Sequence, residues 1–120
     1  DKICHVATAY DFKLVVFLQA LIYFKTPLTE GEKGLANHPA FRDYVQRQYQ
    51  RIRPPFNDMN TRYAKGNRCF FADISDTFAG DPAHRFWDFI HTDNDGNKII
   101  AGRMYDFIKE KKILELAHRQ

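Results

Sequence analysis

An aspartate and a histidine three residues apart, Asp88 and His91, are the side chains whose types and spacing best suit catalysis. In a turn, residues at this spacing can face each other, so the Asp88 carboxylate could accept a hydrogen bond from Nδ1–H of His91. That bond would fix the tautomer whose Nε2 is free to take a proton. A serine hydroxyl is a poor nucleophile until such a base accepts its proton. The pair therefore predicts the acid–base half of a serine hydrolase site.

The residues around the pair add weight, because Asp-x-x-His alone also suits a turn-capping aspartate beside a partly buried histidine. Residues 86–101 read FWDFIHTDNDGNKIIA, with an aromatic pair before the motif and a glycine and an apolar helix start after it. This block resembles the last conserved block of the SGNH (GDSL-type) hydrolases. Residues 13–19 with 25–30, and residues 69–78, are similar to a core strand and its loop and to the strand and loop preceding that block.

This resemblance implies a fold, a reaction and two site residues. The fold is α/β, part of a three-layer α/β/α flavodoxin-like sandwich with a parallel sheet. Residues 1–120 would form the C-terminal portion of one SGNH hydrolase-like domain, with the N-terminal strands missing from this chain. The implied reaction is cleavage of acyl or acetyl esters without metal or cofactor, with Asp88 as orienting acid and His91 as general base. Acylated carbohydrates and lipids are candidate substrates.

The chain departs from the family pattern at the nucleophile. The family serine lies in a Gly-Asp-Ser-like sequence near the N-terminus, whereas the one serine here, Ser75, follows a strand and precedes the Asp88 block. We expect the Ser75 hydroxyl to make a local turn bond with nearby backbone. Asn57-Asp58 lies on an expected helix and is not interpreted as the family's oxyanion-hole Asn-Asp. The serine and the oxyanion donors are therefore expected from an N-terminal part of the same domain. The alternative is a non-catalytic binding or structural module derived from a hydrolase fold.

Other reactive residue types have weaker patterns. Four further histidines have no metal-ligand spacing backed by a third ligand (His5, His38, His84 and His118). Residues 93–97 superficially resemble a calcium loop, but the glycine comes too early and Met104 stands where a bidentate glutamate is needed. Helix capping is the expected role of this segment. Trp87 is open to two interpretations, as a wall of a substrate pocket or as a packing anchor for the loop.

The cysteine content and the net charge limit the other kinds of function that the chain could have. Cys4 and Cys69 allow one disulfide, although the apolar surroundings of Cys69 favour a buried thiol. The net charge is +3, and the cations concentrate in residues 42–53, where we expect the solvated face of a helix rather than a nucleic-acid site. No stretch approaches the ~18 apolar residues of a membrane span.

The elements that must position the pair follow from hydrophobic patterning and from prolines and glycines. In the first half of the chain we expect the end of a helix in 1–11, a buried strand in 12–19, a loop in 20–33 and an amphipathic helix that begins at Pro39 and is stopped by Pro54-Pro55. A shorter helix in 57–64, capped by Gly66, and a strand in 68–72 should follow. The rest should be a loop-rich segment in 73–95 and a helix from Asn94 or Asp95 to Lys111, with Asn94 as its N-cap. Strands alternating with helices predict an α/β layered fold. Two strands make a poor parallel sheet, so the pattern also indicates an incomplete domain.

Overall fold

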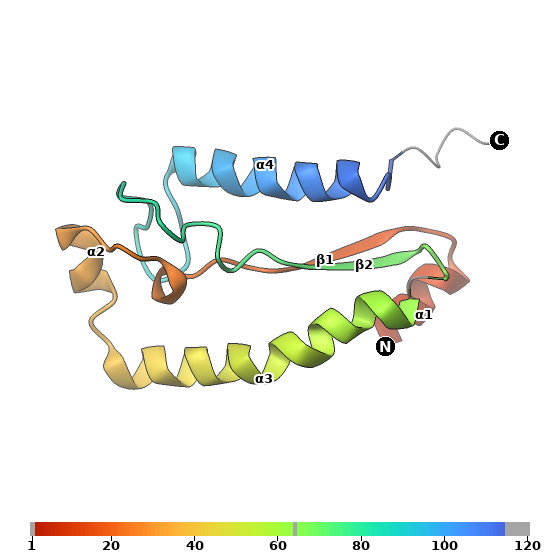
Figure 1. Ribbon diagram of the computed structural model, residues 1–120, viewed down its shortest axis with the longest axis horizontal. Helices are drawn as coiled ribbons and strands as arrows, with labels where there is room; N and C mark the ends of the chain where they lie inside the picture. Colours follow the sequence, from red (N-terminus) through yellow and green to blue (C-terminus); the bar gives the residue numbers. More distant parts are fainter. Residues whose placement is uncertain (1, 64, 115–120) are drawn as a thin grey trace.

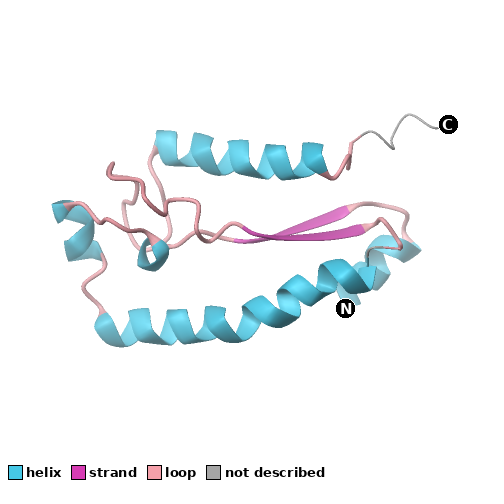
Figure 2. Ribbon diagram, in the orientation of Figure 1, coloured by secondary structure: helices cyan, strands magenta, loops and turns pink. Residues whose placement is uncertain are grey.

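The computed structural model of the protein describes residues 2–63 and 65–114. Its elements are α1 (Lys2–Ala9), β1 (Leu14–Leu18), the 3-10 helix η1 (Ile22–Phe24), α2 (Glu30–Leu35), α3 (Pro39–Tyr63), β2 (Cys69–Asp73) and α4 (Asn94–Glu110). Two strands run through the middle, with α3 on one side and α4 on the other (Figure 1). Helices and strands alternate along the chain (Figure 2), which confirms the predicted mixed α/β class.

The two strands pair in parallel, in a register from Leu14 opposite Cys69 to Leu18 opposite Asp73. Their nearly continuous apolar sequence suits strands covered on both faces. On one face the ring of Phe71 meets Phe56 of α3 at 5.3 Å between centroids. On the other, Phe17 meets Phe107 of α4 at 5.8 Å. The strands predicted for 12–19 and 68–72 are thus confirmed, with ends shifted by one or two residues.

The prediction that Pro54 and Pro55 end the long helix is wrong, since α3 runs through both prolines to Tyr63. Figure 1 shows α3 bent about its middle, as expected where missing N–H donors interrupt the hydrogen-bond ladder. Tertiary contacts hold the second half in place. The Asn60 side chain donates to the carbonyl of Phe71 at 2.7 Å and accepts from its N–H at 2.9 Å. The helix expected in 57–64 is therefore the end of α3, and Ala64 lies outside the described residues.

Helix ends differ from the predictions in three places. The left-handed residue after α3 is Asn67 (φ 48°) and not Gly66, because asparagine also tolerates this conformation. Asp93, not Asn94, is the N-cap of α4, and its side chain accepts from the N–H of Gly96 at 2.5 Å. The segment predicted as a loop in 20–33 contains η1 and the start of α2, which Thr29 caps.

The interpretation of Cys69 as a buried thiol is wrong, because Cys69 forms a disulfide with Cys4. Both residues are buried, and the bond links α1 to β2. Phe71 and Cys4 belong to the same small core cluster, against which Phe56 of α3 packs. The disulfide therefore ties the N-terminal helix to one end of the sheet.

Replacing both cysteines by alanine should lower the free energy of unfolding by ~2–5 kcal/mol, because the bond closes a long loop, with a sequence separation of 65. Urea denaturation of the oxidised wild type and of the Cys4→Ala/Cys69→Ala variant measures the difference. A reducing agent should destabilise the wild type and leave the double variant unchanged. Equal stability of the oxidised wild type and the variant would contradict this role.

Candidate active site

The side chains of Asp88 and His91 are in direct contact. Nδ1 of His91 lies 2.7 Å from Oδ2 of Asp88. The other carboxylate oxygen, Oδ1, accepts from the backbone N–H groups of Ile90 at 2.8 Å and of His91 at 2.7 Å. The carboxylate is thus oriented by the turn that it caps, and the imidazole is oriented by the carboxylate. The turn and the side-chain pair form one local unit.

The hydrogen bonds hold the Asp88 carboxyl in its ionised form. The backbone N–H of His91, then the His91 imidazole and the backbone N–H of Ile90, lower the pKa of Asp88 to about 2. The carboxylate is therefore ionised at neutral pH. A charged acceptor favours the tautomer with hydrogen on Nδ1 and stabilises the imidazolium if Nε2 takes a proton.

The histidine ring is open to approach. Its side chain is 76% exposed, and it borders a cavity of about 300 Å³. That cavity lies between the ends of the strands and the first half of α4, and the residues lining it are Gln19, Ala20, Ile74, Ile90, His91, Thr92, Asn97, Ile100 and Met104. A hydroxyl could therefore reach Nε2 from solvent or from this cavity.

A narrow loop carries the pair. Phe86 and Thr92 form an isolated antiparallel bridge, and the N–H of Trp87 donates to the carbonyl of His91 at 2.9 Å. The tip of the loop is held to the segment after β1, where the N–H of Ile22 donates to the carbonyl of Phe89 at 3.1 Å. Phe86 is fully buried, whereas Trp87 is 68% exposed. The packing anchor of the loop is therefore Phe86 and not Trp87.

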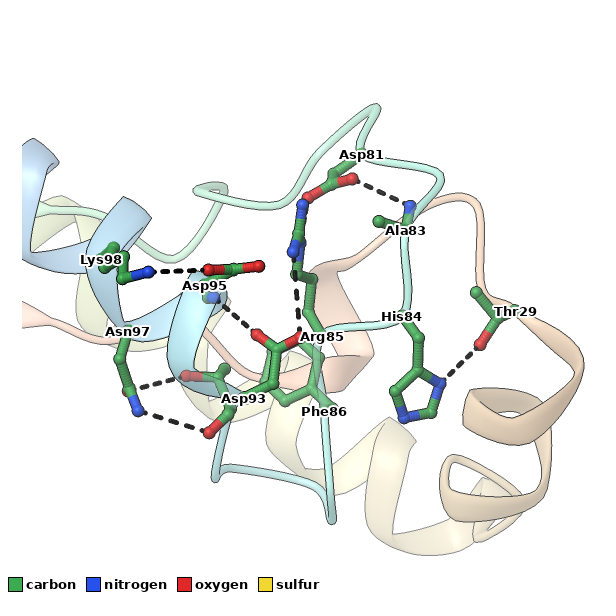
Figure 3. A network of polar contacts seen from close by, with 12 residues as sticks. Thr29, Asp81, Ala83, His84, Arg85, Phe86, Asp93, Asp95, Asn97 and Lys98 are labelled. Atoms are coloured by element: carbon green, nitrogen blue, oxygen red, sulfur yellow. Dashed lines mark hydrogen bonds and ion pairs between the residues drawn. The ribbon is translucent and has the colours of Figure 1, made fainter.

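Ion pairs brace the loop from its other side (Figure 3). Arg85 reaches Asp81 at 2.7 Å and Asp93 at 3.8 Å. Burial raises the pKa of Asp81, but the hydrogen bonds from the Arg85 guanidinium and the Ala83 N–H outweigh it, and the net pKa is lowered. Since Asp93 also caps α4, this network joins the loop to the helix that follows. The capping role expected of residues 93–97 is confirmed, with Asp93 as the capping residue.

The side chain of Ser75 lies apart from the Asp88–His91 pair and is hydrogen-bonded to other side chains. It is buried, its hydroxyl donates to Asp73 at 2.5 Å, and it accepts from Arg53 at 2.7 Å. The hydroxyl of Ser75 therefore bonds to two side chains and not to nearby backbone as expected, although its bond to Asp73, two residues away, is local. The Arg53 guanidinium also lies over the ring of Phe24 at 4.9 Å, and its side chain is only partly exposed. The other arginines of residues 42–53 are exposed, as predicted for a solvated helix face (Arg42, Arg47 and Arg51).

The remaining candidates are placed as follows. The ring of His5 lies edge-on to Tyr63, and His84 contacts the Thr29 hydroxyl at 3.0 Å, while His118 lies outside the described residues. Asn57 and Asp58 lie within α3, as expected. In residues 2–63 and 65–114, no group of three or more His, Cys, Asp or Glu side chains could hold a metal. No helix among them is long and apolar enough to cross a membrane.

Sequence reasoning missed one buried group near the loop, the ion pair of Lys25 with Glu32. Both residues lie in the segment predicted as a loop, residues 20–33. The available signal was the spacing of Thr29 and Glu32, which is that of a capping box at a helix start. The two side chains of this box cap each other's backbone, but the spacing cannot reveal the contacts of Glu32 with residues far along the chain.

Comparison with models of protein families, with curated proteins and with solved structures gave no match. Function is therefore inferred from the geometry of the Asp88–His91 pair and from the chemistry that this geometry permits.

Proposed function

We propose that the protein is an ester hydrolase of the SGNH type, in which Asp88 orients His91 and His91 is the general base of a Ser–His–Asp mechanism. The observation that carries the proposal is the 2.7 Å contact of Nδ1 of His91 with Asp88 on a ring that is exposed to solvent. A histidine held in this way has one nitrogen committed to the carboxylate and the other available to a reacting hydroxyl.

The proposed steps follow from this arrangement. Nε2 of His91 takes the proton of a serine hydroxyl as its oxygen attacks the ester carbonyl, and the Asp88 carboxylate stabilises the imidazolium that forms. The imidazolium then returns the proton to the departing alcohol, which leaves an acyl-enzyme. His91 next takes a proton from the water that attacks the acyl group, and the imidazolium returns this proton to the serine oxygen as the acid is released. These steps use no metal or cofactor.

The serine is proposed to come from an N-terminal part of the same domain, together with the oxyanion donors. Ser75 is the one serine of this chain, and its buried hydroxyl already bonds to Asp73 and Arg53. A parallel sheet normally has more than two strands and is covered by helices on both faces. The pair β1–β2, with α3 and α4 on opposite sides, is compatible with the edge of a three-layer flavodoxin-like sandwich.

The substrate is proposed to be an ester, with acylated carbohydrates or lipids as the candidate classes. The side chain of His91 is 76% exposed, so a bulky alcohol could approach the ring. Part of the lining of the neighbouring cavity is apolar (Ala20, Ile74, Ile90, Ile100 and Met104). An acyl chain could lie against these side chains.

Asp88→Asn in the full-length protein should reduce kcat for ester hydrolysis by ~10²–10⁴-fold with little change in KM. Asparagine cannot stabilise the imidazolium by charge, and its amide can hold the wrong tautomer of His91. Hydrolysis of a p-nitrophenyl ester measures the effect. Asp95→Asn is the matched control, because Asp95 is exposed and its ion pair in the described part of the chain is with Lys98.

Two outcomes would count against the proposal. If Asp88→Asn and Asp95→Asn retain equal activity, Asp88 does not assist catalysis. If the full-length protein hydrolyses none of a panel of acetyl, acyl and sugar esters, the alternative of a non-catalytic binding or structural module is favoured. The observation that favours this alternative is that the hydroxyl of Ser75 is buried and already hydrogen-bonded to Asp73.

A further inference from the structure

The Glu32 carboxylate is buried at the start of α2 and binds donors on both of its oxygens. Oε2 accepts from Nζ of Lys25 at 2.8 Å and from the backbone N–H of Thr29 at 3.0 Å. Oε1 accepts from the backbone N–H groups of Arg85 at 2.8 Å and of Phe86 at 3.2 Å. Neither the Lys25 nor the Glu32 side chain is exposed to solvent. With the Thr29 hydroxyl, which donates to Oε2 at 3.1 Å, five donors from three separate segments converge on one carboxylate.

These donors keep the group ionised. Burial raises the pKa of Glu32, but the hydrogen bonds from the Lys25 ammonium and from the N–H groups of Thr29, Arg85 and Phe86 lower it to about 2. Bonds to an ionised acceptor are shorter and stronger than bonds between neutral groups. Oε1 thus gives the N–H groups of Arg85 and Phe86 an acceptor at a defined place in the interior.

The backbone of Arg85 and Phe86 is the base of the loop that carries Asp88 and His91. The carbonyl of Arg85 accepts from the N–H of Asp93 at 2.7 Å, and Phe86 forms the bridge with Thr92. These contacts link Arg85 and Phe86, which precede Trp87, to the two residues directly after His91. A displacement of Arg85 and Phe86 would therefore move both members of the pair.

Helix capping alone does not account for the position of Glu32. The capping box with Thr29 uses Oε2, and it would be complete without any further partner. Oε1 is turned instead to residues 53 and 54 positions further along the chain. An exposed glutamate at this position would cap α2 equally well, so burial of the charge serves the long-range contact.

We propose that Glu32 is a positioning residue for the Asp88–His91 pair, whose carboxylate holds the base of their loop in the geometry required for proton transfer. The contribution to catalysis rests on the proposed ester hydrolase function. The contribution to the contact of Asp88 with His91 does not, and it can be measured without a substrate.

Two double variants of the full-length protein separate positioning from charge burial. Lys25→Met/Glu32→Gln removes both charges but keeps an oxygen that can accept from Arg85 and Phe86. Lys25→Met/Glu32→Leu also removes both charges and leaves these N–H groups without an acceptor. Removing both members of a buried ion pair leaves neither charge unpaired, so each double variant should be less destabilised than a variant that neutralises Lys25 or Glu32 alone. Glu32→Asp is a further variant, which keeps a charge beside Lys25 but is too short to span both sets of donors.

The first readout is the imidazole ¹⁵N spectrum of His91, recorded well below the unfolding midpoint of each variant. We expect the glutamine variant to retain the wild-type tautomer with hydrogen on Nδ1, and the leucine and aspartate variants to lose it in part. The second readout is ester hydrolysis. We expect kcat to fall by ~10²-fold in the leucine variant with KM nearly unchanged, as for a misplaced catalytic group. The glutamine variant should stay within about threefold of wild type. Glu30→Gln, an exposed change on the same helix, is the control.

The outcomes distinguish the two proposals. A wild-type His91 spectrum in both the leucine and aspartate variants would overturn the positioning role of Glu32. A changed spectrum in these variants, with no ester hydrolysis by the wild type, would support that role and count against the proposed function. Equal losses of kcat in the glutamine and leucine variants would assign the effect to the lost charges and would also overturn the positioning role.

Discussion

His91→Ala in the full-length protein is expected to lower kcat/KM for ester hydrolysis by ~10³-fold or more, because general base catalysis and the activation of the nucleophile depend on this one ring. Its side chain is 76% exposed, and its ring bonds to Asp88, whose side chain is itself 46% exposed. The thermal unfolding midpoint should therefore stay near that of the wild type. Initial rates on a p-nitrophenyl ester and a thermal melt of the same preparation measure the two quantities.

His38→Ala is the matched control for this change. His38 is also exposed, and it lies just before α3, outside the loop that carries the pair. Its replacement should leave kcat/KM and the unfolding midpoint unchanged. If His91→Ala retained activity within a few-fold of this control, His91 would not be the general base, and the proposed mechanism would be wrong.

Phe86→Ala is expected to lower the free energy of unfolding by ~3–5 kcal/mol, the range for truncating a buried aromatic ring. Phe86 has no solvent exposure, and its ring meets that of Phe78 at 5.4 Å between centroids. Both belong to the larger core cluster, which includes Ile22 and Tyr23. Since small domains are stable by only ~5–15 kcal/mol, this loss is a large fraction of the total. Urea denaturation followed by circular dichroism measures it.

Phe89→Ala provides the comparison within the same loop. Phe89 is 43% exposed and contacts the ring of Phe41 at 5.5 Å, so truncation leaves no enclosed cavity and should cost less than ~1 kcal/mol. A loss at Phe86 no larger than the loss at Phe89 would show that the loop base is not part of the cooperative core. It would also weaken the inference that the loop is rigidly placed.

Local patterns in the sequence were sufficient for the features that depend on neighbouring residues. The strands in 12–19 and 68–72 were predictable because buried parallel strands are continuously apolar. The contact of Asp88 with His91 was predictable because a turn brings residues three apart together, although its catalytic role stays a proposal. The capping of α4 followed from a polar segment before an apolar helix, but the choice of Asp93 over Asn94 depended on backbone angles that the pattern does not specify.

Features that join distant parts of the chain were not predictable. Cys69 pairs with Cys4 across 65 positions of the chain, and the part of α3 beyond Pro54 is hydrogen-bonded to β2 through Asn60.

The sequence by itself determined the strand and helix types and the local unit of Asp88 and His91, because these follow from side-chain periodicity and short-range hydrogen bonding. Only the tertiary structure decided the disulfide and the reach of Glu32 to Arg85 and Phe86. Such contacts require the approach of segments more than 50 residues apart, and that approach depends on the packing of the whole fold.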